Sequence, residues 1–188
     1  MSHQFLPLDI HPSAMNGMKG HGEDAFPNEC CGFFYGEEKN GVRVVSCANR
    51  IENVKEGDQR RRFEISGKDY MKAERFATQE GLTLLGIYHS HPLHPAIPSE
   101  HDLAVAMPWF SYVIVSVEKE GVDHVRSWQL TTERQFEEEI IQNGNVNNPN
   151  PPQKIYGWKV RIRSFSIRCQ RSSQRTFYLT RGHSKTSL

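Results

Sequence analysis

The chain has 188 residues, a formal net charge of +1 and a hydrophobic fraction of 37%. This length is typical of one domain, or of one domain with an appendage, and it allows a buried core without disulfides or a structural metal. The near-neutral charge argues against a dedicated polyanion-binding protein. No apolar run approaches the roughly 20 residues that span a membrane, and we expect no signal peptide.

The charge is unevenly distributed along the chain. Residues 143–188 carry nine Lys and Arg and no Asp or Glu, so +1 minus +9 leaves −8 for residues 1–142. Residues 143–152 have the Asn, Gly and Pro composition of a linker. We therefore predict a domain at 1–142, followed at 143–188 by a linker and a basic, disordered tail.

Two other interpretations of the tail stay open. The stretch KVRIRSFSI (159–167) could form an amphipathic strand with one basic side, which would bind an anionic partner or, weakly, nucleic acid. It could also echo the first strand of a ubiquitin-like fold, although too little chain follows to complete one.

The four cysteines are Cys30, Cys31, Cys47 and Cys169. They show no CxxC or zinc-finger spacing, and the chain is long for a disulfide-stapled secreted domain. We therefore expect a reducing, cytoplasmic setting.

The first part of the domain is predicted to be mostly extended. Residues 11–25 read as a poor helix, because three glycines interrupt it. A short buried strand is predicted over CGFFYG (31–36), and an alternating strand over 41–51. A further strand is predicted over RRFEIS (61–66).

The central part alternates helix and strand. Residues 69–81 place apolar side chains on one helical face and end at Gly81, a natural helix terminator. Residues 82–90 are almost wholly apolar, which is typical of a central strand covered on both faces. A short helix over 100–107 is stopped by Pro108.

The last part contains two strands, 111–119 and 123–130, around a turn at Gly121. Residues 131–142 are predicted to form an amphipathic helix opened by threonine caps. Strands and helices mixed in this way favour a three-layer α/β or α+β domain.

Four of the nine histidines lie in the segment HSHPLHPAIPSEHD, residues 89–102. At the end of a strand, residues i and i+2 project to the same side, so His89 and His91 can face one point. Neutral imidazole nitrogens suit zinc, and a catalytic zinc typically has three protein ligands and one open position. Asp102, in the first turn of the next helix, is the natural third ligand. We therefore predict one zinc ion.

A helix cap offers an alternative interpretation of part of this segment. Ser99 and Asp102 have the spacing of a capping box, with Ser99 as N-cap, and this needs no metal. The cap does not account for two histidines at the end of a buried strand, where unsatisfied imidazoles are costly. Both interpretations can hold together. His94 and His101 are predicted to be surface histidines.

A zinc hydrolase also needs a general base that takes a proton from water. Glu29, in PNECCG just before a buried strand, is the candidate. Four rival carboxylates, Glu23, Glu37, Glu38 and Glu64, remain open on the sequence.

The motif H-S-H-P, six residues and then S-x-x-D resembles the signature of the JAMM metalloproteases, the MPN-plus or JAB domain. The segment PNECCG resembles the upstream glutamate segment of that family. The resemblance covers residues 5–142 and is closest to short, stand-alone prokaryotic members. It implies a cytidine-deaminase-like α/β sandwich, with a central mixed sheet flanked by helices.

The resemblance also implies residue roles. His89, His91 and Asp102 would bind zinc, Glu29 would activate water, and Ser99 would stabilise the oxyanion. The implied reaction is hydrolysis of a peptide or isopeptide bond beside the C-terminal Gly-Gly of a ubiquitin-like or sulfur-carrier protein. Homodimerisation stays open.

Three other functions compete with this one. A non-catalytic MPN-type scaffold would bind protein partners and would need none of these ligands. A zinc deaminase would need an H-x-E motif and a PCxxC pair, whereas here His91 follows Ser90 in the place of the Glu, and Cys30 and Cys31 are adjacent. A basic binding module built on the tail would show salt-dependent binding of polyanions.

Overall fold

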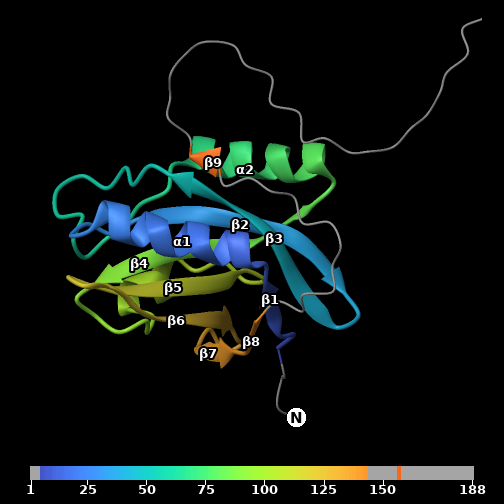
Figure 1. Cartoon of the computed structure of the whole chain (residues 1–188). Helices are drawn as coiled ribbons and strands as arrows, with labels where there is room; N and C mark the ends of the chain where they lie inside the picture. Colours follow the sequence, from blue (N-terminus) through green and yellow to red (C-terminus); the bar gives the residue numbers. More distant parts are fainter. Residues whose placement is uncertain (1–4, 144–155, 158–188) are drawn as a thin grey trace, which may run out of the picture.

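The computed structural model describes residues 5–143 and 156–157 (Figure 1). Its elements, in chain order, are β1 (Leu8–Ile10), α1 (Pro12–Ala25), β2 (Cys31–Lys39), β3 (Val42–Ile51), α2 (Gly67–Glu80), β4 (Thr83–Pro92), α3 (Glu100–Val105), β5 (Ser111–Glu118), β6 (Gly121–Leu130), β7 (Phe136–Glu139), β8 (Ile141–Asn143) and β9 (Tyr156–Gly157). The predictions for the linker and tail fall almost wholly outside the described residues. No described helix is long and apolar enough to cross a membrane.

The strands form one mixed sheet with the order β7-β6-β5-β4-β2-β3-β1-β8, and β9 pairs with β3. β4 pairs with β5 in parallel and with β2 in antiparallel orientation, so it lies in the middle of the sheet. Every β4 residue after Thr83 is buried. This confirms the central strand that the apolar run predicted.

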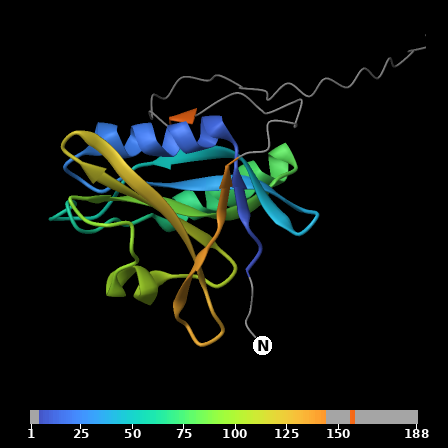
Figure 2. The same cartoon turned by 60° about the horizontal axis from the view of Figure 1, so that its bottom comes forward.

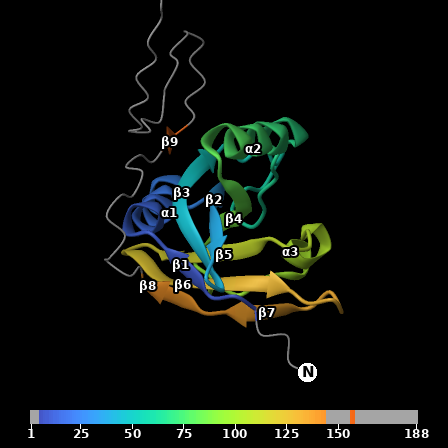
Figure 3. The ribbon, with the colours of Figure 1, turned by 90° about the vertical axis from the view of Figure 1, so that its right-hand side faces the viewer.

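Helices cover both faces of the sheet (Figure 3). On one face, α1 packs on a core that includes Met18, Phe34 and Val115. On the other face, α2 and α3 contribute Ala77 and Leu103 to a second core. The predicted three-layer α/β sandwich with a central mixed sheet is therefore confirmed.

α1 is a regular helix of 14 residues in spite of its glycines, and in this respect the expectation was too pessimistic. Pro12 begins it, and the His11 side chain accepts a hydrogen bond from the Ser13 amide at 3.2 Å. Gly22 is buried against the sheet, where an added Cβ would lie 3.0 Å from Val117 Cγ2. The glycine therefore allows a close approach of helix and sheet.

The helix predicted over 131–142 is wrong, because this region forms β7 and β8. The threonine that was expected to cap a helix instead builds the turn after β6. The Thr131 amide donates to the Gln135 carbonyl at 2.8 Å, and the Gln135 amide donates to Thr131 Oγ1 at 3.2 Å. Arg134 takes a positive φ of 57° in this turn. Pairing with β6 and β1 outweighs the local helical pattern.

β7 and β8 also close the sheet. They stand at opposite ends of the strand order, yet only Ile140 separates them in the chain. The sheet must therefore curl until its two ends meet along residues 136–143, which run between β6 and β1 (Figure 2).

The strand predicted over 61–66 is also absent, since no ladder pairs these residues. The segment is a loop whose alternation has a different cause. Phe63 and Ile65 pack into the core on the α2 side, while the Glu64 amide donates to Asn53 Oδ1 at 3.1 Å. The Asn53 side chain and one backbone bond, from the Val54 amide to the Glu64 carbonyl at 3.1 Å, hold this segment in place of a regular ladder.

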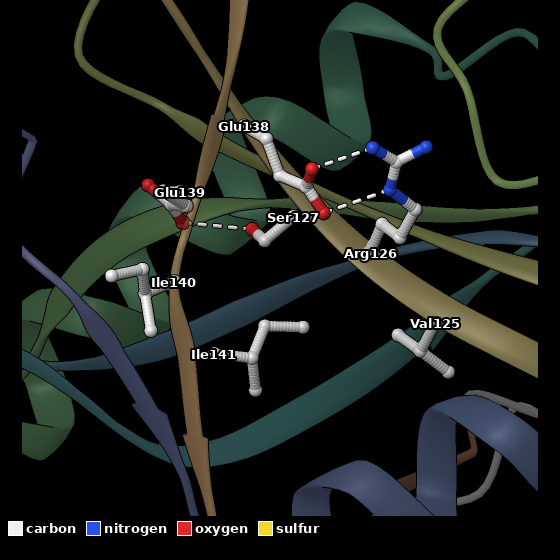
Figure 4. A pocket seen from close by; sticks show the side chains of 7 residues that line it. All are labelled: Val125, Arg126, Ser127, Glu138, Glu139, Ile140 and Ile141. Carbon is white, nitrogen blue, oxygen red and sulfur yellow. Dashed lines mark hydrogen bonds and ion pairs between the residues drawn. The ribbon is translucent and has the colours of Figure 1, made fainter.

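A hollow of about 250 Å³ lies between β6 and the β7–β8 segment, at the point where the two diverge (Figure 4). Beside it runs a buried set of polar residues that we call the Ser111 network: Arg43, Ser111, Ser127 and Glu139. Glu139 accepts hydrogen bonds from Ser127 Oγ at 2.7 Å and Ser111 Oγ at 3.0 Å. Arg43 donates to Ser111 and, at 3.1 Å, to the Leu85 carbonyl. These bonds tie β3 and β4 to the strands that close the sheet.

Candidate metal centre

Three predicted ligands meet at the end of β4. His89 and His91 project from the same face, and their Nε2 atoms lie 3.0 Å apart. Asp102, from the first turn of α3, places Oδ1 3.5 Å from His89 Nε2 and Oδ2 3.6 Å from His91 Nε2. All three residues are at most 8% exposed. One ligand atom from each falls within 4.8 Å of the others.

These separations fit a tetrahedral metal site. Nitrogen and oxygen ligands at 2.0–2.1 Å from a tetrahedral zinc lie about 3.3 Å from one another. The observed ligand-to-ligand distances of 3.0, 3.5 and 3.6 Å bracket that value. Two imidazoles and one carboxylate are also a donor set that zinc accepts.

Neighbouring groups orient both imidazoles. His91 Nδ1 lies 3.0 Å from the Pro95 carbonyl, which can only accept, so Nδ1 carries the proton and Nε2 keeps a free lone pair. The His89 ring stacks on Phe63, with 4.6 Å between ring centroids. His89 Nδ1 is buried and finds no hydrogen-bond partner among the described residues.

Asp102 is both a helix-capping residue and a member of the cluster. The Ser99 amide and Oγ donate to Asp102 Oδ2 at 2.6 and 2.7 Å, and the Asp102 amide donates to Ser99 Oγ at 3.2 Å. The predicted capping box is therefore present, and it aims the carboxylate at the histidines. The two interpretations of this segment hold together.

Electrostatics favours the metal-binding protonation state at His89 and Asp102 and opposes it at His91. Burial lowers the pKa of His89, which favours the neutral imidazole. Burial alone would raise the pKa of Asp102, but His89 and the hydrogen bonds around the carboxylate hold that pKa well below its usual range. Burial also opposes charge on His91, yet contacts with Asp102 and the Pro95 carbonyl raise its pKa.

Glu29 reaches the same face of the sheet through strand register. β2 begins at Cys31, which pairs with His89 in the antiparallel ladder. Hydrogen bonds between Cys30 and Ser90 continue the pairing by one step. Glu29 therefore lies opposite His91, and strand alternation gives the two side chains the same face.

The rival carboxylates lie elsewhere. Glu23, Glu37, Glu38 and Glu64 are exposed, whereas Glu29 is only 7% exposed. Burial raises the pKa of Glu29 to about 7, and the nearby Asp102 adds to this rise while His91 opposes it. A carboxyl group that titrates near neutral pH can both accept and return a proton.

The remaining histidines of the motif stay outside the cluster. His94 is exposed, and its carbonyl accepts a hydrogen bond from Ser116 Oγ at 2.7 Å. His101 is half-buried, and its ring is not among the ligand atoms. No pattern in the sequence indicated that the Pro95 carbonyl would orient His91. The role of Phe63 beside His89 was not predicted either, because residues 61–66 were expected to form a strand.

Comparison with known proteins agrees with this geometry. The family described as prokaryotic homologs of the JAB domain matches residues 11–131. A desampylase of Pyrococcus furiosus is 32% identical over 110 residues, which are 58% of this chain and 72% of that protein. A probable TtuB-protein conjugate cleaving protease of Thermus thermophilus is 45% identical over 60 residues, 32% of this chain and 37% of that protein.

A solved structure resembles the fold as well. The solution structure of a protein from Desulfitobacterium hafniense has a TM-score of 0.65 and 26% identity, and the match covers 74% of this chain and 95% of that one. The chain therefore belongs to the family of prokaryotic JAB-domain homologues, which are metal-dependent, and the peptidase class expected from its motif is confirmed.

Proposed function

We propose that this protein is a zinc isopeptidase or peptidase that cuts beside the C-terminal Gly-Gly of a ubiquitin-like or sulfur-carrier protein. The observation that carries the proposal is the convergence of His89, His91 and Asp102 with Glu29 on the same face. The desampylase and the conjugate-cleaving protease among its relatives support the substrate class.

His89, His91 and Asp102 would hold the metal. Zinc bound there would lower the pKa of a coordinated water and so supply a nucleophile at neutral pH. The Glu29 carboxylate would take a proton from the attacking water and return it to the leaving amine nitrogen. Burial raises the pKa of Glu29 to about 7 in the metal-free site, and a carboxyl with a raised pKa can both take and return a proton near neutral pH.

Ser99 would stabilise the negative charge that develops on the carbonyl oxygen. Its hydroxyl has one proton, which Asp102 Oδ2 accepts at 2.7 Å in the structure. Donation to the oxyanion therefore requires the hydroxyl to rotate away from Asp102. The Ser99 amide keeps its own bond to Oδ2, so Asp102 remains oriented while the hydroxyl rotates.

We place this reaction in the cytoplasm. Cys30 and Cys31 are buried thiols, and burial raises the pKa of Cys30 to about 12, which keeps it inert. Buried reduced cysteines agree with a reducing compartment.

The test is to incubate the zinc-loaded protein with a ubiquitin-fold carrier extended beyond its Gly-Gly, and to follow the intact mass of the carrier. A Glu29→Gln variant runs in parallel, because it keeps the shape of the side chain and removes the base. Loss of a general base should slow cleavage by about 10²–10⁴-fold.

Cleavage after Gly-Gly that collapses in Glu29→Gln would support both the reaction and the role of Glu29. Equal cleavage by the two proteins would remove Glu29 from the mechanism. Bound zinc without cleavage of any carrier would contradict the substrate class and favour a scaffold that binds protein partners.

A further inference from the structure

The peptide backbone around Glu29 is held where regular strand pairing has ended. β2 starts at Cys31, so Glu29 and Cys30 lie outside its ladder. All four of their backbone polar groups are nevertheless bonded. The Glu29 amide donates to the Gln59 carbonyl at 2.7 Å, and the Glu29 carbonyl accepts from Asn53 Nδ2 at 3.0 Å.

Ser90 binds the other two groups. Its Oγ accepts a hydrogen bond from the Cys30 amide at 2.8 Å, and its own amide donates to the Cys30 carbonyl at 3.1 Å. Ser90 is fully buried and stands between His89 and His91 in the chain. It therefore links the residue after Glu29 directly to the strand segment that carries both histidines.

Asn53 approaches from the loop between β3 and α2. Its amide group donates to the carbonyls of Glu29 and Arg62, at 3.0 and 3.1 Å. Its Oδ1 accepts from the amides of Lys55 and Glu64, at 3.0 and 3.1 Å. Both donors and both acceptor positions of the side chain are thus used. The same loop carries Phe63, which stacks on His89.

We propose that Ser90 and Asn53 are positioning residues that keep Glu29 in register with the metal ligands. The inference rests on the proposed function, in which Glu29 moves the proton. Ser90 fixes Glu29 relative to β4, and Asn53 fixes it relative to the loop that covers His89. Neither side chain is required for binding the metal or for the proton transfer itself.

The kinetic test uses Ser90→Ala, which removes the acceptor, and Asn53→Asp, which keeps the shape and the acceptor but removes both donors. Each variant should keep its zinc content and KM while kcat falls by about tenfold to a hundredfold, since small misplacements of a catalytic group are costly. In a Glu29→Gln background, the same substitutions should lower kcat further by about twofold or less.

The matched control is Ser127→Ala, which also removes a buried serine hydroxyl but lies in the Ser111 network. It should leave kcat and KM of the folded enzyme unchanged. A loss of kcat that persists in full in the Glu29→Gln background, or that follows a loss of zinc, would overturn the proposal. So would unchanged kcat in both variants.

A second readout uses metal-free protein and needs no activity. Amide hydrogen exchange should accelerate about tenfold at Cys30 in Ser90→Ala, which removes the acceptor of that amide. It should also accelerate at Cys30 in Asn53→Asp, which frees the Glu29 carbonyl of the same peptide unit, with no change at Ile114 in β5 in either variant. If the wild type cleaves no carrier, the proposed function fails and exchange alone decides. Faster exchange would then support the proposal that Ser90 and Asn53 hold the backbone around Glu29, and unchanged exchange would overturn it.

Discussion

The two ends of β4 each hold a buried cluster of titratable groups, and the clusters differ in where their polar atoms point. Near the start of β4, the members of the Ser111 network bond to one another. Ser111 accepts from Arg43 and donates to Glu139, and Ser127 donates to the other oxygen of Glu139. Near its end, His89, His91 and Asp102 point toward one another across gaps that a metal ion would fill. From Leu85 to the histidines is about 13–20 Å along the strand.

Hydrogen bonding distinguishes a structural carboxylate from a candidate catalytic one more clearly than burial does. Burial raises the pKa of Glu139 just as it raises the pKa of Glu29. Glu139, however, has both carboxylate oxygens bonded to serines. Glu29 has its backbone fixed, and no hydrogen bond of its carboxylate appears in the described structure. A satisfied carboxylate stabilises the fold, whereas one held at its backbone remains available for chemistry.

The largest expected effect is at the metal centre. His91→Ala should abolish zinc binding and activity, because two ligands cannot hold a catalytic zinc. The protein should still unfold cooperatively, since the cores on both faces of the sheet are left intact. Zinc content by mass spectrometry, together with cleavage assays, measures this. His94→Ala is the matched control, and an equal loss there would contradict the assignment of ligands.

The Ser111 network should respond in the opposite way. Arg43→Met leaves Glu139 buried without its cation and should cost about 3–5 kcal/mol of unfolding free energy. The kcat of the folded fraction should stay unchanged. Denaturant titration and active-site-normalised kinetics test both parts. Adding Glu139→Gln should recover part of the stability. A double variant as unstable as the sum of both single changes would show that Arg43 and Glu139 do not stabilise each other.

Ser99→Ala should fall between these extremes, because Ser99 serves both the helix and the site. Removing an oxyanion donor lowers kcat by about 10²–10³-fold. Losing the N-cap costs about 0.5–2 kcal/mol of unfolding free energy. Measuring kcat and stability on the same preparation separates the two. Lost stability with unchanged kcat would leave Ser99 as a cap alone.

A smaller, pH-dependent effect is expected on the α1 face. Burial, aided by Arg50, lowers the pKa of His21 to about 4, and His21 Nδ1 lies 2.8 Å from the Tyr88 hydroxyl. The unfolded chain binds more protons than the folded one between about pH 6.5 and pH 4, so this contribution is full above pH 6.5 and is lost as pH falls. It amounts to at most about 3 kcal/mol.

Denaturant titrations of metal-free protein over that pH range should therefore show a shallower decline for His21→Gln than for the wild type. Parallel curves for the two proteins would show that His21 does not titrate between the folded and unfolded states.

The sequence was sufficient for elements whose signals are local. Gly81 ends α2 with a left-handed φ of 66°, as its place after an apolar face predicted. Strand alternation and the spacing of the capping box brought His89, His91 and Asp102 together correctly. The glycines of α1 led to the wrong expectation of a poor helix, because Gly22 serves the close approach of helix and sheet, which the sequence does not show. The helix predicted over 131–142 was wrong because this region pairs as strands with β6 and with β1, and β1 is distant in the sequence.

The sequence by itself was enough to pick out His89, His91 and Asp102 as candidate metal ligands, since strand alternation and a helix cap, both local patterns, direct their side chains. Only the tertiary structure decided which carboxylate joins them. Glu29 is sixty residues before His89, and its place before a strand made it a candidate without excluding Glu23 or Glu64. The antiparallel register of β2 on β4 makes the choice, because backbone pairing sets both the position and the face of a side chain.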